Sequence, residues 1–268
     1  MNFVLSDKDC VEGMAELPAK SVQICVTSPP YNIGVKYSRY DDSVRRSEYL
    51  AWTKTWAVQL QRVMADDGSF FLNVGASPSN PMLPHEILLV MKDLFVLQNT
   101  IHWIKSITLE SKSGEFVSSG HFKPINSKRY VTDCHEYIFH LTKTGRVPIH
   151  RLAVGVPYAD KSNVKRWLHT GGSDRRCRGN NWFIPYSTIQ DRNGQRPHPA
   201  TFPKELPEMC LRLHGACPYS TMLDPFLGIG NSALAALACG LKNFIGFEID
   251  PGYLEVARRL VRGNKNYC

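Results

Sequence analysis

The stretch "TMLDPFLGIGNSALAALACG", Thr221–Gly240, predicts a strand, a glycine-containing turn and a helix in immediate succession. Thr221–Leu223 is a short apolar strand, and an Ala- and Leu-rich helix is expected over Ser232–Cys239. Between them, Gly228 and Gly230 let the backbone approach a ligand closely, and the start of the helix offers unpaired N–H groups. This arrangement is typical of α/β folds that bind a nucleotide or a nucleoside, although a G-x-G pair by itself can also be a plain tight turn.

A second strand, within "NFIGFEID" at Asn243–Asp250, carries Glu248 twenty residues after Gly228. A carboxylate at this spacing can accept both hydroxyl groups of a ribose. Only twenty residues follow Glu248, so a dinucleotide fold would need its further βα units upstream, and a nicotinamide cofactor is the weaker alternative. A single adenosine with a short charged appendage fits better. S-adenosylmethionine has this shape, and Asp224 could meet its positively charged amino-acid end.

The rest of the chain alternates short apolar runs with longer segments of helical periodicity, which predicts an α/β sheet. Further strands are expected at Phe3–Leu5, Val22–Val26, Ser69–Val74, Val96–Trp103, Glu136–Leu141 and Asn243–Glu248. Further helices are expected at Ser47–Met64, Leu83–Leu94, Lys204–Leu213 and Gly252–Arg262. Ser47, followed by Glu48, is the expected N-cap of the first of these helices. Thr144–Gly194 breaks the alternation and is expected to form an insertion on the scaffold.

Composition and cysteine content bound the class of protein. The 268 residues are 43% hydrophobic and 21% charged, which fits one large domain or one domain with an insertion. No apolar run reaches the ~18–20 residues that span a bilayer, and the N-terminus lacks the regions of a secretory signal. The eight cysteines include no C-x-x-C pair, so we expect reduced thiols and no bound metal.

The net charge of +8 favours a polyanionic partner. Residues 143–192 hold ten Lys and Arg against three Asp, a surplus of seven in one segment. Trp, Phe and Tyr residues lie among these cations, together with Gly and Asn, which is typical of a nucleic-acid surface; a solvated loop face is the alternative. The candidate DNA contacts are Lys165, Arg166, Arg175, Arg176 and Arg178.

A second unusual stretch, "VTSPPYN" at Val26–Asn32, joins a β-branched run to two consecutive prolines. Pro29 and Pro30 supply no backbone N–H donors and have a fixed φ. The turn is therefore stiff, and it holds Ser28, Tyr31 and the neighbouring carbonyls in set directions. Such a turn suits a site whose few groups must be aimed well, although a plain surface turn can have the same sequence.

Four segments together resemble the DNA amino-methyltransferases of the β arrangement: "TSPPYN", "HPATFP", "LDPFLGIGNSALAA" and "FIGFEID" (Thr27–Asn32, His198–Pro203, Leu223–Ala236 and Phe244–Asp250). In that family the catalytic motif comes first, the target-recognition segment next and the cofactor motif last. The resemblance covers nearly the whole chain. It implies a Rossmann-like, seven-stranded methyltransferase sheet with circularly permuted motif order. It also implies S-adenosylmethionine as methyl donor and the exocyclic amine of a DNA base as acceptor.

The resemblance implies roles for individual residues. The catalytic tetrapeptide is Ser28, Pro29, Pro30 and Tyr31. The cofactor-binding residues are Asp224, Phe226, Gly228, Gly230, Asn231 and Ser232 in the glycine loop, Glu248 at the ribose, Thr201 and Phe202 in a further turn, and Asp9 and Cys10 near the adenine. The segment Arg129–Lys143 resembles the motif that precedes target recognition.

The residue types suit this chemistry. An exocyclic amine is a poor nucleophile because its lone pair is delocalised into the ring. Ser28 Oγ and the Pro29 carbonyl can accept hydrogen bonds from its two N–H groups, which favours attack on the sulfonium methyl. The base must first be flipped out of the duplex, and Tyr31 offers a ring for stacking. Methylation of a ring carbon would need a cysteine nucleophile, usually after a proline, whereas Cys217 precedes Pro218.

Within the resembling family, Ser at the first position of the tetrapeptide goes mostly with N4-cytosine, and Asp goes with N6-adenine. Ser28 therefore predicts methylation of cytosine N4. The resemblance as a whole implies a site-specific DNA methyltransferase of a restriction-modification system. The alternatives are N6-adenine methylation on the same scaffold, a catalytically silent DNA-binding module, and a methyltransferase that acts on RNA or on protein glutamine.

The resemblance also implies a division of the chain and a set of partners. The methyltransferase domain is expected to consist of a catalytic part at residues 1–143, a target-recognition insertion at 144–194 and a cofactor-binding part at 195–268. Double-stranded DNA is the expected partner and a membrane is not. A homodimer and a cognate restriction nuclease are left open. The expected location is the cytoplasm or nucleoid of a prokaryote, or the nucleus of a eukaryote.

Overall fold

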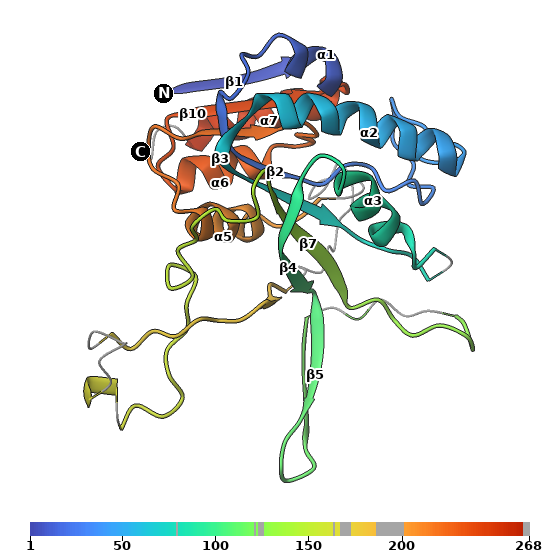
Figure 1. Cartoon of the computed structure of the whole chain (residues 1–268). Coiled ribbons are helices and arrows are strands. Elements are labelled where there is room, and N and C mark those ends of the chain that lie inside the picture. The colour runs from blue at the N-terminus through green and yellow to red at the C-terminus, as the bar shows by residue number, and fades with distance from the viewer. Residues whose placement is uncertain are drawn as a thin grey trace.

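The short apolar runs form an eight-stranded sheet at the centre of the molecule (Figure 1). This computed structural model describes residues 1–78, 80–120, 122, 126–162, 164–166, 173–185 and 201–264. The strands, in their order across the sheet, are β1 (Asn2–Asp7), β10 (Asn243–Glu248), β9 (Thr221–Asp224), β2 (Val22–Thr27), β3 (Met64–Val74), β7 (His135–Thr142), β4 (Val96–Ile104) and β8 (Asn181–Phe183). The first five are parallel, and β7 is antiparallel to both of its neighbours.

Helices cover both faces of this sheet. On one face lie α1 (Cys10–Ala15), α2 (Arg46–Val63) and α3 (Leu83–Met91); on the other lie α5 (Glu205–His214), α6 (Asn231–Ala238) and α7 (Pro251–Asn264). Successive residues of β2 show why both faces are apolar. Ile24 and Val26 pack in the core beneath α5–α7, whereas Cys25 packs in the core beneath α1–α3. This two-sided burial explains the continuous apolar runs that predict the strands.

The sheet order brings two distant parts of the sequence together. In the described strands β2 and β9 are adjacent and parallel, with Cys25 opposite Leu223. Their carboxyl ends therefore lie at the same edge of the sheet, where an α/β fold places its ligand. Thr27 Oγ1 donates a hydrogen bond of 2.6 Å to Asp224 Oδ1, across 197 residues of sequence. The proline turn and the glycine loop start immediately after these two residues.

The structure contains every strand and helix expected from the sequence and corrects several details. The sheet has one strand more than the seven implied, because β8, which lies in the expected insertion, pairs with β4. The short helix α1 and the 3₁₀ turn η1 (Val164–Arg166) were not expected. The prediction of Ser47 as an N-cap is wrong. Arg45 occupies that position and its side chain makes no capping hydrogen bond.

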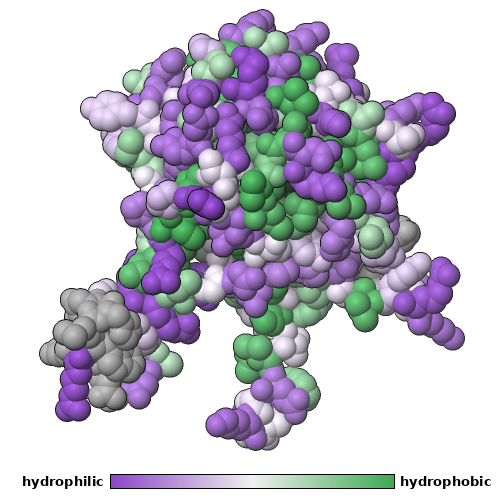
Figure 2. All heavy atoms as spheres, in the orientation of Figure 1, coloured by the Kyte–Doolittle hydropathy of each residue, from purple (hydrophilic) through white to green (hydrophobic). Residues whose placement is uncertain are grey.

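A two-stranded hairpin of β5 (Ser106–Glu110) and β6 (Phe116–Gly120) was also not expected from the sequence. It projects from the body of the molecule (Figures 1 and 2). Leu109, Phe116 and Val117 on this hairpin are exposed. Its apolar residues therefore pack against no second layer among the described residues, and its strands lack the burial that makes other strands of this fold recognisable.

Two further features concern the membrane and the thiols. None of the described helices is long and apolar enough to cross a bilayer. The seven cysteines within the described ranges are free thiols, and Cys268 lies outside those ranges.

The expected division at residues 143/144 and 194/195 stays a prediction. Val154, Trp182 and Ile184, from the expected insertion, are part of the core beneath α5–α7.

Candidate active site

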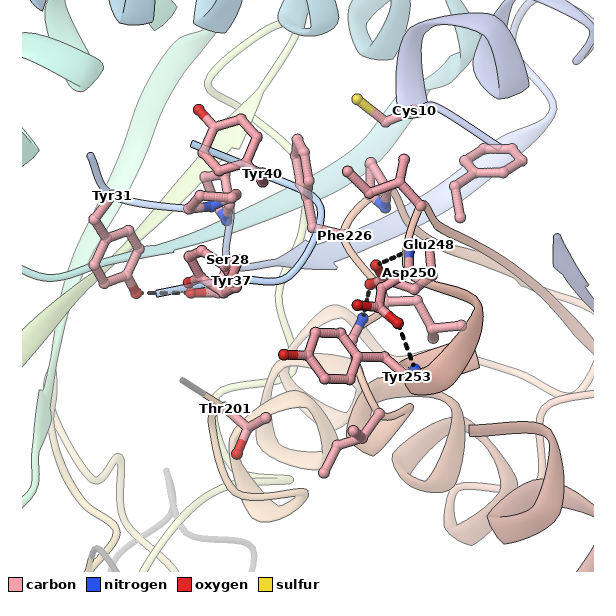
Figure 3. Close-up of a pocket in the computed structure, with 18 of the residues that line it drawn as sticks. Cys10, Ser28, Tyr31, Tyr37, Tyr40, Thr201, Phe226, Glu248, Asp250 and Tyr253 are labelled. Carbon is pink, nitrogen blue, oxygen red and sulfur yellow. Dashed lines mark hydrogen bonds between the residues drawn. The ribbon is translucent and has the colours of Figure 1, made fainter. Parts of the chain in front are cut away.

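A cavity of about 280 Å³ opens at the carboxyl edge of the sheet. Both distinctive stretches line it: the proline turn after β2 contributes Ser28 and Tyr31, and the glycine loop after β9 contributes Phe226 and Gly228. Figure 3 shows Ser28 and Tyr31 on one side of the cavity and Glu248, which ends β10, on the other. The carboxyl ends of adjacent parallel strands meet at this edge, so residues far apart in sequence share one cavity.

Most of the predicted site residues line this cavity. Those that do so are Asp9, Cys10, Ser28, Pro29, Pro30, Tyr31, Thr201, Phe202, Phe226, Gly228, Asn231 and Glu248. Asp224, Gly230 and Ser232 do not belong to the lining. His198, Pro199 and Ala200 of "HPATFP" lie outside the described residues.

The proline turn is held from two sides. The hydroxyl of Tyr49 donates a hydrogen bond of 2.8 Å to the Pro30 carbonyl from beneath. Asn32, which ends the turn, has a φ of +55°, a conformation that asparagine tolerates better than most residues. The buried carboxylate of Asp42 accepts hydrogen bonds from the backbone N–H groups of Asn32, Ile33 and Val35. The stiffness expected from two prolines is thus supplemented by tertiary hydrogen bonds.

Ser28 belongs to a hydrogen-bonded cluster at the mouth of this turn. Its Oγ lies 2.7 Å from the Tyr31 hydroxyl, which in turn lies 3.0 Å from Glu136 Oε2 in β7. Asn73 of β3 donates through Nδ2 to Tyr31 at 2.8 Å and to Glu136 at 2.7 Å. Burial beside the Glu136 carboxylate raises the pKa of the Tyr31 hydroxyl well above its usual value, so Tyr31 is a neutral donor.

The glycine loop has the backbone shape that its sequence suggests. Gly228 and Gly230 have φ values of +54° and +90°, in the region that only glycine adopts readily. A Cβ at Gly230 would lie 2.9 Å from the Cβ of Ala257 in α7, so the loop also needs glycine for close packing. Asn231 starts α6 and donates through Nδ2 to the Phe202 carbonyl at 2.7 Å. The loop and the residue 202 turn are therefore joined.

Glu248 stands at the end of β10 with both carboxylate oxygens in use. Its Oε2 accepts from Gly228 N and its Oε1 from Asp250 N, each at 2.8 Å. Burial raises the pKa of this carboxyl, and the two backbone N–H groups oppose that rise. Each carboxylate oxygen has a further acceptor position, so the side chain can still receive the hydroxyl groups of a ribose.

Asp224 lies outside the cavity lining, and its expected contact with a charged amino-acid end stays a prediction. Its side chain is fully buried and accepts hydrogen bonds from Thr27 Oγ1, Ser232 Oγ and the backbone N–H of Phe226. Burial raises the pKa of Asp224 to about 6. Asp224 and Ser232 tie β9, the glycine loop and the proline turn together from behind the cavity.

Three further predicted residues on the cavity wall, Asp9, Cys10 and Thr201, differ in how their side chains are used. Asp9 is the N-cap of α1, where its Oδ1 accepts from Val11 N at 2.7 Å, so it has a structural use besides facing the cavity. Cys10 is buried, and burial raises the pKa of its thiol above the usual range. Thr201 Oγ1 is a buried hydroxyl that no described residue pairs with. An unpaired polar atom on the cavity wall fits a bound polar ligand there.

Aromatic residues that sequence reasoning missed form another wall of the cavity. The loop after the proline turn brings Tyr37 and Tyr40 over it, and Tyr40 packs on Trp52, whose ring meets Phe226 at 5.5 Å between centroids. Ser38 in the same loop donates a hydrogen bond to Asp250, which lies on the cavity wall two residues after Glu248. No periodicity marks these residues, and only the fold of the loop brings them to the site.

The polar residues Asn73 and Glu136 were also missed. A signal for Asn73 exists, because it is the one polar residue in the apolar run "FFLNV" and lies near the carboxyl end of its strand. Glu136 is the second residue of β7 and so lies near its start instead of its end. It reaches the same edge because β7 runs antiparallel to β3, and the sequence does not reveal that direction.

The candidate DNA contacts lie away from this cavity. Arg175 and Arg176 are exposed, although each makes one hydrogen bond to a backbone carbonyl. Arg178 is half-buried and donates through Nε to the Val154 carbonyl at 2.9 Å, so it supports its own loop. Arg166 is exposed on η1, and the side chain of Lys165 lies outside the described residues.

Among the described residues, no cluster of three or more His, Cys, Asp and Glu side chains is arranged to hold a metal ion. The polar groups on the cavity wall include hydroxyls, side-chain amides, carboxylates and backbone N–H groups. A Rossmann-like sheet that combines this glycine loop, acid and proline turn in one cavity defines a methyltransferase.

The chain belongs to the family described as DNA methylase, which comprises N6 and N4 enzymes; the match covers residues 22–259. The type II methyltransferase M.ScaI of Streptomyces caespitosus is 30% identical over 267 residues, which are 96% of this chain and 80% of that protein. M.BglII of Bacillus subtilis is 27% identical over 265 residues, covering 95% and 68%.

Two solved structures share the fold. The PvuII DNA methyltransferase (cytosine-N4-specific) has a TM-score of 0.70 at 20% identity and covers 96% of this chain and 86% of its own. A protein of Thermus thermophilus described as a DNA modification methylase, in complex with S-adenosyl-L-methionine, has a TM-score of 0.64 at 24% identity and covers 97% and 93%. The expected family and the Rossmann-like fold class are therefore confirmed.

Proposed function

We propose that this DNA methyltransferase transfers a methyl group to the exocyclic N4 amine of a flipped cytosine in duplex DNA. One observation carries the proposal: Ser28, a neutral hydroxyl, holds the first position of the tetrapeptide and lines the cavity that also contains the glycine loop and Glu248. In the resembling family, Ser at this position goes mostly with cytosine, whereas Asp goes with adenine. The relatives M.ScaI and M.BglII are type II methyltransferases by name, which supports a role in restriction-modification.

The cofactor is S-adenosylmethionine, supported by the family membership and by the neighbour solved with it. The cavity fits such a ligand. Glu248 offers acceptors for a ribose, Phe226 and Ile249 offer apolar surface, and Thr201 Oγ1 is an unpaired hydroxyl on the wall. When bound, S-adenosylmethionine supplies an electrophilic methyl group. Every other contribution comes from residues of the chain.

These residues act by position and polarity. Ser28 Oγ and the Pro29 carbonyl are the acceptors for the two N–H groups of the target amine, which raises the electron density on its nitrogen. The hydrogen bond from Tyr49 to Pro30 keeps the turn in place while the base is bound. Tyr31 closes the side of the base pocket next to Ser28, and its ring is available for stacking.

The deciding experiment identifies the methylated base. Duplex DNA is incubated with methyl-labelled S-adenosylmethionine and the protein, then digested to nucleosides and separated. N4-methylcytosine is the expected product. N6-methyladenine would contradict the assignment based on Ser28, and the absence of any methylated nucleoside from DNA that contains many sequence contexts would favour a silent DNA-binding module.

A further inference from the structure

A series of polar contacts runs along the cavity wall from Ser28 to an ion pair between Glu136 of β7 and Lys105, which directly follows β4. Ser28 Oγ meets Tyr31 at 2.7 Å, Tyr31 donates to Glu136 Oε2 at 3.0 Å, and Lys105 Nζ donates to Glu136 Oε1 at 3.0 Å. The Glu136 and Lys105 side chains are only 16% and 22% exposed. A half-buried, paired carboxylate at the end of such a chain determines which atoms donate and which accept.

We propose that Glu136 is a positioning residue that acts through Tyr31 to make Ser28 a hydrogen-bond acceptor toward the target amine. A serine hydroxyl can donate or accept, and only the accepting arrangement activates an amine. An ionised carboxylate only accepts, so Glu136 accepts a hydrogen bond from the Tyr31 hydroxyl. The Tyr31 oxygen then accepts a hydrogen bond from Ser28, and the Ser28 lone pairs are left for the amine. This inference rests on the proposed function of Ser28.

Counting protons and lone pairs gives one consistent assignment. Asn73 Nδ2 has two protons, and its two short contacts are to Glu136 at 2.7 Å and Tyr31 at 2.8 Å, whereas its contact to Ser28 is 3.3 Å. The Tyr31 hydroxyl thus donates to Glu136 at 3.0 Å, in preference to the Asn73 carbonyl at 3.3 Å, and it accepts from Asn73 and from Ser28. All of its hydrogen-bonding capacity is used, and the single Ser28 proton has one destination.

The packing around Glu136 leaves little freedom for another arrangement. A Cβ on Gly75 would lie 3.1 Å from Glu136 Cγ and Cδ and 3.1 Å from Tyr31 Cε2. The two side chains therefore press against a glycine backbone, and neither can move toward it. Glu136 is paired across the sheet with Trp103, two residues before Lys105, which holds the ion pair in register.

The test variant reverses the direction of the hydrogen bonds that join residue 136, Tyr31 and Ser28, and it keeps the size of the side chain. In Glu136→Gln, the Lys105 ammonium attracts the amide oxygen, so the amide NH₂ faces Tyr31. The Tyr31 lone pairs are then taken by Asn73 and by the new amide, and Ser28 can no longer donate to Tyr31. We expect kcat for DNA methylation to fall by roughly tenfold or more, as for the loss of one oriented hydrogen bond in an active site. The KM for S-adenosylmethionine should stay unchanged, as in the exposed control Glu205→Gln.

A second variant separates polarity from packing. In Lys105→Met/Glu136→Gln the ammonium is absent, so the amide can turn its oxygen toward Tyr31 and restore an acceptor. The double variant should therefore be several-fold faster than Glu136→Gln alone. A residue with only a packing role would give the opposite order, because the double variant removes one more contact. A double variant no faster than the single variant would overturn the inference.

The Tyr31→Phe background provides an independent measurement. Without the Tyr31 hydroxyl, Glu136 has no route to Ser28, so Glu136→Gln should change kcat by no more than roughly twofold in that background. An undiminished loss there would also overturn the inference. The wild type is assayed first. If it methylates no base, the proposed function fails; if it methylates adenine, only the cytosine assignment fails, and the variants still decide the role of Glu136.

Discussion

Ser28 shows how much one side chain depends on its surroundings. The residue directly follows Thr27, whose own hydroxyl is bound to Asp224 beneath the glycine loop. On its other side, Ser28 meets the Tyr31 hydroxyl. The neutral hydroxyl of Ser28 thus lies between the buried Thr27–Asp224 hydrogen bond and the polar cluster around Tyr31.

At this scale, Ser28→Ala removes one acceptor for the target amine and leaves the glycine loop untouched. Turnover should fall by roughly tenfold or more, while affinity for S-adenosylmethionine stays close to that of the wild type. Steady-state methylation of duplex DNA gives the first quantity, and calorimetric titration with S-adenosylhomocysteine gives the second. The exposed Ser47→Ala on α2 is the matched control. An equal loss of turnover and affinity would place Ser28 in the cofactor site instead.

Glu248→Gln tests the other side of the cavity. The carboxylate holds Gly228 N and Asp250 N with separate oxygens, and an amide has only one oxygen to replace them. Affinity for S-adenosylhomocysteine should fall by roughly tenfold or more, since hydrogen bonds to charged groups contribute ~1.5–3 kcal/mol. Glu255→Gln on the exposed side of α7 is the control.

The pH dependence has a defined sign in the same titration. Burial raises the pKa of Glu248, so the carboxylate is protonated at a higher pH than an exposed one. Wild-type affinity should therefore decrease as the pH falls toward that raised pKa, and the decrease should be absent in Glu248→Gln. A wild-type affinity that is flat across the acidic range would contradict the role of the ionised carboxylate.

At the scale of elements, several strands recognised from sequence, such as β2 and β3, are buried on both faces. β2, β3 and β10 are short apolar runs with turn residues at each end, which is the sequence pattern that predicts a buried strand. The hairpin β5–β6 and the three-residue β8 were missed because they carry no such burial pattern. The helix α1 has six residues, too few for a period, although its Asp9 cap is a usable local signal.

A buried histidine joins several of these elements. His140 of β7 accepts from Asn99 of β4 at Nδ1 and donates from Nε2 to Ser69 of β3, whose hydroxyl lies 2.9 Å from Nδ1 of His214 in α5. Its ring stacks on Phe71 at 4.5 Å. Burial lowers the pKa of His140 to about 4, because the charged ring would be desolvated and would be repelled by a charge on His214.

This pKa predicts acid sensitivity. The folded pKa of His140 lies below the unfolded value of 6.5, so its contribution to stability is complete above about pH 6.5 and is lost as the pH falls to about 4. The loss amounts to roughly 3 kcal/mol, because a tenfold difference in proton affinity between the folded and unfolded states corresponds to about 1.36 kcal/mol. Urea unfolding of wild type and His140→Gln at several pH values should give free energies that converge as the pH falls. The exposed His85→Gln should keep the wild-type slope, and a constant difference for His140→Gln would contradict the assignment.

At the scale of the whole molecule, the exposed cations of the expected recognition insertion and the catalytic cavity lie on different parts of the chain. Arg175 and Arg176 are exposed, whereas Arg178 is engaged with Val154. Arg175 and Arg176 also make one backbone hydrogen bond each, but their exposed side chains are more accessible to phosphate than that of Arg178. Duplex DNA would have to reach both this loop and the cavity for a specific base to be flipped into the site.

Arg175→Ala/Arg176→Ala should weaken DNA binding and flatten its salt dependence. Each lost phosphate contact lowers the slope of log K against log salt by about 0.9, so two contacts lower it by about 2. Binding of duplex DNA at several salt concentrations, by fluorescence anisotropy, measures the slope. Arg259→Ala/Arg262→Ala, two exposed cations on α7, should leave it unchanged. A slope equal to that of the wild type would remove the first pair from the interface.

Sequence alone determined the α/β class, the order of the motifs and the residue types of the site, because periodicity, turn chemistry and motif spacing are local properties of the chain. The burial of Asp224 shows where such reasoning stops, because a sequence does not reveal whether a carboxylate beside a glycine loop is buried. Tertiary structure alone decided that Asp224 lies behind the cavity and that Glu136, Asn73 and Lys105 surround Tyr31. The physical reason is that strand order and the reversed direction of β7 determine which distant side chains meet, and both depend on packing of the whole sheet.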